Sequence, residues 1–343
     1  MCASHTLILI ASVDIEHSIF NNNKYFPKRN VLRQALSKMT AFLNKIGRSI
    51  SAAEKVKEVF GIALPTPCPT RWNSLYNSLS SFLKHYKKSL DAAGTVFRSL
   101  GIPVLTKDDL DLLIEYMHCV KPLAATLDIF QGEKGCFLGK GVVLPLLTKL
   151  KKQLNQRVFP NLGPLRDKIL SRIQDRYESC NIISVLYIWS RIFLFRFDHL
   201  FLDNSYPIAA CTHPFFLTNW IEDSKQKEDV VTKLKLLLSD ADSPLSEKSA
   251  SSTEDFLSFA SNNPTLKPNE VDYFLDDKDV SMEMLNRYPQ IKNIFIKHNT
   301  AIPTSSPVES LFSQAALILT VRRNKLSDSF LEILILLQIA LGV

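Results

Sequence analysis

Two residues near the amino terminus have the types and spacing of half a metal site. Cys2 and His5 lie three residues apart, so on a helix they would share a face, and thiolate and imidazole are the usual ligands of structural zinc. The later cysteine and histidine residues lack the spacing that would complete a zinc finger. A hydrogen-bonded pair or a frayed terminus is the simpler interpretation, and we expect neither a metal site nor a cofactor.

A tryptophan beside an arginine has the chemistry to bind nucleic acid. Arg71 and Trp72 follow a cluster of prolines, which imposes an extended approach to them. The indole can stack on an unpaired base while the guanidinium pairs with a phosphate. Alternatively, Trp72 packs under the helix expected from about Ser74 to Leu90, with Arg71 in a salt bridge. The residues alone leave both interpretations open.

A single carboxylate, Glu309, stands at the start of an expected helix near the carboxyl terminus. Mg²⁺ takes oxygen ligands, but two-metal cleavage of a phosphodiester needs several converging carboxylates. Glu309 alone is most simply a helix-start acid that interacts favourably with the helix dipole. The sequence also has no Gly-rich phosphate loop and no HExxH motif. Its own residues therefore point to no catalytic centre.

Length and composition bound the class of protein. A chain of 343 residues can bury a large core in about two domains, and 46% hydrophobic residues exclude a disordered chain. Lys and Arg number 41 against 34 Asp and Glu, and the net charge of +7 slightly favours a nucleic-acid partner. The cysteines have no paired spacing and no secretory leader precedes them, which favours reduced thiols in the cytosol or nucleus. No apolar run approaches the ~20 residues that span a bilayer, so we expect no membrane partner.

Apolar residues recur at helical spacing along most of the chain. One face is formed from Val31 to Ile46, and successive amphipathic helices are expected from Thr106 to Trp220. Few stretches alternate with a period of two, so little sheet is expected. Residues 239–270 are rich in Ser, Asp, Asn and Pro, which predicts a flexible surface linker.

The last expected helix is apolar nearly all round, and Ser329 with Glu332 would start it as a capping box. Ile335, Leu336 and Ile339 form one apolar side. One face of the helix can pack on its own domain and the other on a second subunit, or both are buried within the monomer. The stripe opposite that side, with residues every three or four positions, consists of Leu326, Phe330, Ile333, Leu334, Leu337 and Leu341.

Four stretches resemble, in family order, the hAT transposase superfamily. The most specific of them, from Ile302 to Leu341, resembles the C-terminal dimerisation segment of that family. The other three run from Cys2 to Ile10, from Pro69 to Ser74 (which contains Thr-Arg-Trp-Asn-Ser) and from Ile208 to Phe216. In the C-terminal segment the matching parts are Pro303, Thr304-Ser305-Ser306, Glu309, Phe312-Ser313, Arg323 with Leu326, and the apolar helix from Phe330 to Leu341.

The resemblance implies an incomplete catalytic set. In the family, the glutamate that Glu309 matches is the last of three acidic residues that hold the catalytic metal ions. The stretch that begins at Cys2 follows the strand with the second catalytic aspartate, so we expect both aspartates and any BED-type zinc finger to be absent. Ser310 stands where the family usually has Arg, which argues further against a retained active site.

The resemblance also implies a role in DNA binding. The Arg-Trp pair of the family suits flipped bases near transposon ends, and this assigns DNA binding to Arg71 and Trp72. Runs of basic residues are usually solvated helix faces, but in such a protein they could follow the DNA backbone. The runs are Lys84, Lys87 and Lys88, and Lys149, Lys151, Lys152, Arg157 and Lys168.

We therefore expect a mainly α-helical chain that closes with the hAT dimerisation helices. Residues 1–80 would be an α/β remnant of an RNase H-like fold, residues 81–295 a large all-helical insertion, and residues 296–343 the dimerisation region. The expected function is that of a transposase-derived, non-catalytic nuclear protein, not an enzyme, which forms a homodimer and binds DNA. The alternatives are a fragment of an active DNA transposase and a protein-interaction scaffold that ignores DNA.

Overall fold

The computed structural model describes residues 3–20, 28–67, 72–86, 90–132, 139–177, 205–241, 270–301 and 304, and then residues 311–312, 315–316, 318–319 and 326–341. All regular structure in these ranges is helical, with fourteen α-helices and no β-strand. The chain divides into two units. Unit 1 comprises Met1–Phe137, Lys149–His199 and Pro303–Val343, and unit 2 comprises Leu138–Thr148 and Leu200–Ile302.

The expectation of an RNase H-like α/β remnant in residues 1–80 is wrong. In the described part of this range the regular structure is helical, because buried apolar residues recur every three or four positions instead of alternating. At the amino terminus these buried residues include Leu7, Ile10, Ile15 and Ile19. One π-helical stretch, η1 (Ile10–Asp14), joins the first two α-helices.

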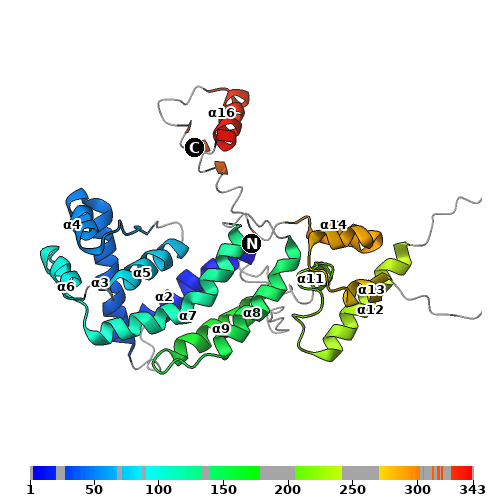
Figure 1. Ribbon diagram of the computed structural model, residues 1–343, viewed down its shortest axis with the longest axis horizontal. Helices are drawn as coiled ribbons and strands as arrows, with labels where there is room; N and C mark the ends of the chain where they lie inside the picture. Colours follow the sequence, from blue (N-terminus) through cyan, green and yellow to red (C-terminus); the bar gives the residue numbers. More distant parts are fainter. Residues whose placement is uncertain are drawn as a thin grey trace, which may run out of the picture. The chain divides into compact units, whose positions relative to one another are not determined.

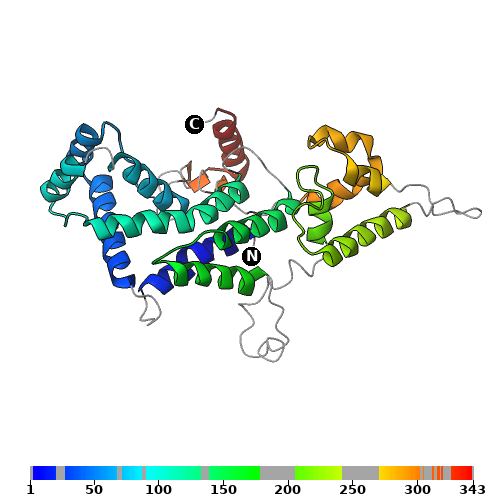
Figure 2. The same cartoon turned by 60° about the horizontal axis from the view of Figure 1, so that its bottom comes forward.

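The longest described helix, α7, forms the centre of unit 1, and α1, α3 and α5 pack against it (Figures 1 and 2). Its buried side chains lie on several sides of the helix, since Leu113 and Pro122, which point in nearly opposite directions around the helix axis, are both buried. The described helices of unit 1 are α1 (Ala3–Leu9), α2 (Ile15–Phe20), α3 (Arg29–Arg48), α4 (Ile50–Phe60), α5 (Trp72–Tyr86), α6 (Leu90–Ser99), α7 (Lys107–Gln131), the second half of α8 (Val143–Asn155), α9 (Gly163–Tyr177) and α16 (Asp328–Leu341).

A cluster of phenylalanine rings joins α3, α4, α5 and α6. Phe42 and Phe97 stack with ring centroids 4.4 Å apart, and Phe82 meets Phe42 edge to face at 5.4 Å. Phe60 adds a further edge contact to Phe82 at 5.9 Å. Such pairs contribute about 0.5–1.5 kcal/mol each beyond the burial of their area. The cluster therefore fixes how α5 lies among its neighbours.

Two carboxylates of α7 hold other segments by polar contacts. Asp109 pairs with Lys38 of α3 at 2.6 Å. Burial raises the pKa of Asp109, but the hydrogen bonds that it accepts, led by that from Lys38, outweigh burial and lower the pKa below its ordinary value. Glu115 accepts hydrogen bonds from the backbone N–H groups of Asn161 and Leu162 at 2.8 and 2.9 Å, and so fixes the turn before α9.

A buried aspartate in the π-helical stretch joins the amino terminus to α9. Asp14 accepts from the Nε and Nη2 atoms of Arg176 at 2.8 and 3.1 Å. Arg172, one turn earlier in α9, lies 3.6 Å from the same carboxylate. A buried carboxylate needs such partners, because burial without them is costly. The burial of the Asp14 carboxylate is thus explained by its two arginine partners.

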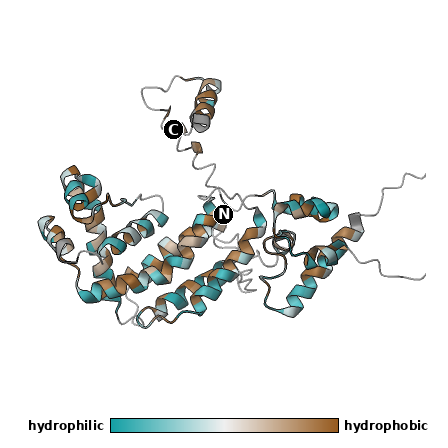
Figure 3. Cartoon of the chain, in the orientation of Figure 1, coloured by the Kyte–Doolittle hydropathy of each residue, from teal (hydrophilic) through white to brown (hydrophobic). Residues whose placement is uncertain are grey.

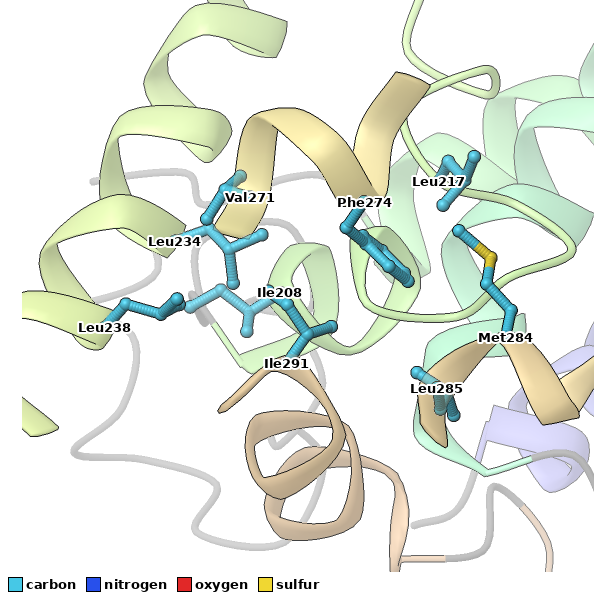
Figure 4. Close-up of a cluster of buried hydrophobic side chains, with 9 residues drawn as sticks. All are labelled: Ile208, Leu217, Leu234, Leu238, Val271, Phe274, Met284, Leu285 and Ile291. Atoms are coloured by element: carbon cyan, nitrogen blue, oxygen red, sulfur yellow. The ribbon is translucent and has the colours of Figure 1, made fainter. Parts of the chain in front are cut away.

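Unit 2 has its own apolar core (Figure 4). The linker predicted for residues 239–270 falls almost wholly outside the described residues, which resume at Glu270. The described elements are η2 (Lys140–Val142), the first half of α8, α11 (Ser205–Cys211), α12 (Ser224–Ala241), α13 (Glu270–Asp276), η3 (Met282–Arg287) and α14 (Pro289–Asn299). The core side chains are Ile208, Leu217, Leu234, Leu238, Val271, Phe274, Met284, Leu285 and Ile291.

One buried amide connects three distant segments of unit 2. The Oδ1 atom of Asn299 accepts from the backbone N–H of Gly141 at 2.9 Å, and its Nδ2 atom donates to the carbonyl of Ala209 at 3.0 Å. Gly141 lies so close to these partners that a Cβ atom there would be 2.6 Å from Asn299 Oδ1 and would clash with the carbonyl oxygen of Ala209. Only glycine allows this approach.

The buried imidazole of His213 lies among aromatic rings just after α11. Its ring centroid is 4.8 Å from that of Phe216 and 5.6 Å from that of Phe295. Its Nδ1 atom accepts from the backbone N–H of Phe215 at 3.2 Å, which places the proton of the neutral ring on Nε2. Burial lowers the pKa of His213 from 6.5 to about 4, because the charged ring would lose its hydration.

None of the helices in the described part of the chain combines the length and the apolar character that crossing a bilayer requires.

The close contact at Gly141 predicts a specific loss of stability. Gly141→Ala is expected to lower the free energy of unfolding by about 1–3 kcal/mol, because the added methyl group displaces backbone and strains the Asn299 hydrogen bonds. Gly163→Ala is the control, since a Cβ atom at that position meets nothing within 4 Å. Urea unfolding followed by circular dichroism measures both, and equal midpoints for the two variants would contradict the prediction.

His213 predicts how stability depends on pH. Its pKa is lower in the folded chain than in the unfolded chain, so the unfolded chain binds more protons between about pH 4 and 6.5. The contribution of the neutral ring is full above pH 6.5 and is lost as the pH falls towards 4, by about 3 kcal/mol at most. Urea midpoints measured from pH 7 to 4 should fall less steeply for His213→Gln than for the wild type. Parallel curves would show that burial does not control this histidine.

Candidate nucleic-acid interface

Trp72 is the first residue of α5, and its side chain is half-buried. Its neighbour Arg71 lies outside the described residues, as do residues 68–70, so the DNA-binding assignment of Arg71 stays a prediction. The intermediate burial of Trp72 matches neither a ring enclosed in the core nor a fully solvated one. Part of the Trp72 side chain is therefore accessible at the start of α5.

The next residue, Asn73, explains why the start of α5 is held in place. Its side chain is only 5% exposed, and its Nδ2 atom donates to the carbonyl of Ala124 at 3.3 Å and to the carboxylate of Asp128. Both partners belong to α7. Sequence reasoning missed this role, because Asp128 is 55 residues away and no local pattern connects the two.

Trp72 lies beside a second aromatic ring on the same helix. The rings of Trp72 and Tyr76 are nearly parallel, with centroids 6.5 Å apart and an angle of 21° between their planes. Tyr76 is also half-buried. Its hydroxyl has a raised pKa, mainly because of burial and to a lesser extent because of the nearby charge of Asp128. The spacing of four residues, which places both rings on one side of a helix, was a signal that could have identified Tyr76.

The acidic residues do not form a metal site in the described part of the chain. Glu309 and its neighbours 305–310 lie outside that part. Asp14 is engaged by two arginines and Asp128 by Asn73. Among the described residues, no group of three or more His, Cys, Asp and Glu side chains is arranged to hold a metal ion.

The candidate zinc ligands are not brought together by the described structure. Cys2 lies outside it, and His5 is exposed on α1. His118 and Cys119 point to different environments, since His118 is exposed and Cys119 is buried. Burial raises the pKa of the Cys119 thiol to about 12, which keeps it protonated and unsuited to metal binding.

The predicted stripe of the last helix presents uncovered apolar side chains on α16. Phe330, Ile333 and Leu337 are between 52% and 54% exposed, whereas Leu326 and Leu334 are half-buried. On the opposite side Leu336 is 58% exposed. Figure 3 shows that hydrophobic residues dominate this helix. The side chain of Leu341 lies outside the described residues.

The start of α16 differs from its prediction. The expected capping box of Ser329 and Glu332 is wrong, because the helix begins at Asp328 and both residues lie inside it. Ser327 caps the helix instead, with its hydroxyl accepting from the backbone N–H of Phe330 at 3.4 Å. The three-residue spacing of a cap also fits Ser327, and the helix uses the earlier serine.

In comparisons with known proteins, no family model matches the chain and no curated protein matches it. The likeness to hAT transposases thus stands on the quoted motifs alone.

Proposed function

We propose that this chain is a transposase-derived, non-catalytic nuclear protein that dimerises through its C-terminal hAT-like segment and binds DNA. The observation that carries the proposal is the uncovered apolar surface of α16, which lies within the segment with the most specific likeness to the family. Apolar side chains exposed on both sides of one helix favour partners on more than one face. A second copy of the same segment is the partner that the resemblance implies.

The DNA-binding part of the proposal is supported by the start of α5. Asn73 fixes the first turn against α7, and Trp72 with Tyr76 forms a pair of aromatic rings that remain half-accessible. Aromatic faces stack on unpaired bases without regard to sequence. The basic excess of the chain supplies attraction to phosphate. Ring stacking and attraction to phosphate read no base edges, so binding through them should be weak, sensitive to salt and indifferent to sequence.

Self-association is tested by sedimentation of the purified full chain at tens of micromolar. The wild type is expected to sediment as a dimer, and Leu337→Asp as a monomer, because a charge in the stripe opposes burial of its apolar area, worth about 1.5–3 kcal/mol per side chain. Ser329→Asp introduces the same charge at an exposed polar position of α16 and should leave the dimer intact.

Leu336→Asp distinguishes the two faces of α16. If that face packs on its own chain, the variant should lose thermal stability but remain a dimer. A folded monomer for the wild type would contradict dimerisation outright.

DNA binding is tested by fluorescence anisotropy at low salt with labelled single-stranded, flap and duplex oligonucleotides. Trp72→Ala should weaken binding to single-stranded and flap DNA by roughly tenfold, since stacking of one base is worth about 1–3 kcal/mol. Binding to plain duplex should change less. Trp72→Phe, which keeps an aromatic face, is the matched control and should retain most of the affinity.

The same variants separate a binding role of Trp72 from a packing role. Thermal unfolding of Trp72→Ala should stay close to that of the wild type, because the side chain is only half-buried. Equal losses of affinity on all three DNA substrates, together with a large loss of stability, would show that Trp72 is a core residue.

A further inference from the structure

A groove lies between α5 and α7, beside the aromatic pair. It has a volume of about 220 Å³ and is lined on α5 by Tyr76, Ser80 and Lys84. His118 and Lys121 line it on α7. Tyr76 belongs both to the groove and to the ring pair with Trp72, so the two features are continuous.

The two helices run antiparallel along this groove. Near the start of α5, Asn73 contacts Ala124 and Asp128, towards the end of α7. Further along α5, Lys84 lines the groove together with residues that lie earlier in α7. Lys121 is therefore nearer the aromatic end, and His118 lies one turn towards Lys84. From Trp72 to Lys84 the helix rises about 18 Å, enough for a few nucleotides of an extended strand.

The groove is lined by positively charged side chains, as a site for an anion requires. Lys84 and Lys121 are exposed, and neither forms an ion pair with any other described residue. None of the described residues that line the groove is acidic, and its floor includes the buried side chains of Leu83 and Met117. Positive charge above an apolar floor concentrates the local field, because the low dielectric of the floor screens it poorly.

The shape and the charge together select the kind of anion. At about 220 Å³ the groove is smaller than the ~300–1,000 Å³ pockets that enclose small molecules, so a chain passing through fits better than an enclosed ligand. The carboxylate of Asp128 lies beside the aromatic end, where it repels phosphate. Phosphates therefore belong at the lysines and planar bases at the rings. An acidic peptide has the charges but need not have the planar groups.

We propose that the α5–α7 groove holds the backbone of an unpaired nucleic-acid strand, with Lys84 and Lys121 at phosphates and the bases reaching the Trp72–Tyr76 pair. This inference rests on the proposed DNA binding and deepens it. It assigns the strand a path across α7, which the sequence motifs do not indicate. Unpaired strand fits because a base must turn out of a duplex before it can stack on a side chain.

The test compares two double variants of the full chain with the same change in charge. Lys84→Gln with Lys121→Gln removes both groove cations, and Lys45→Gln with Lys55→Gln removes two exposed cations outside the groove. Anisotropy with labelled oligothymidylate at several salt concentrations gives the affinity and its salt dependence. The groove variant should bind about tenfold more weakly, and its slope of log K against log salt should shrink by ~1.4, or 0.7 for each phosphate contact. The control pair should change both quantities far less, and circular dichroism confirms that both variants fold.

Each other outcome has a distinct meaning. Equal losses of affinity in the two double variants would overturn the groove proposal, because they would show that binding depends only on net charge. If Trp72→Ala weakens binding while the groove variant does not, the groove is wrong and the proposed DNA binding stands. If oligoglutamate competes as well as oligothymidylate of equal charge, the ligand is an acidic peptide and the assignment to nucleic acid fails. If the wild type binds no nucleic acid, the DNA-binding part of the proposed function fails, and the groove inference falls with it.

Discussion

The burial of α7 on several sides is the constraint on which unit 1 depends. A helix that is apolar around most of its surface must be covered by other helices, and here α1, α3 and α5 cover it. Polar side chains then set how the covering segments meet it. Asp109 fixes α3 through Lys38, Asn73 fixes α5 through Asp128, and each contact is shielded enough to be specific. The apolar surface supplies the attraction, and the buried polar pairs select one arrangement.

The polar anchor of α5 bears directly on the proposed DNA binding. Because Asn73 points into α7, the neighbouring Trp72 is turned away from the helix interface by one step of the helix, and its ring remains half-accessible. The residue that anchors α5 and the residue that we propose to contact DNA are therefore adjacent in sequence. The apolar face on α16 belongs to a different segment of the chain. Changes at one surface can thus leave the chemistry of the other unaltered.

The sequence allowed the prediction of helices but not of all their contacts. Apolar spacing from Val31 to Ile46 correctly indicates α3, and the same count applied to residues 3–20 would have excluded an α/β remnant. The resemblance carried a fold expectation that this periodicity does not support. Ser327 replaced Ser329 as the cap because serines two residues apart satisfy the same local rule. The groove could not be predicted, since it needs Lys84 and Lys121 from separate helices whose pairing only the packed structure shows.

The amide of Asn299 has a consequence for the order in which the chain folds during synthesis. Its bond to Gly141 spans 158 residues, so a ribosome that adds about 5–20 residues per second makes Gly141 wait roughly 8–30 s for its partner. The helices from α1 to α7 contain their mutual contacts within the first 131 residues and can form in that interval. The first residues of unit 2 to be made are 138–148, and the unit is completed only when the chain reaches residue 302. On the nascent polypeptide, the segment around Gly141 therefore lacks its hydrogen-bond partner until the residues near 299 emerge.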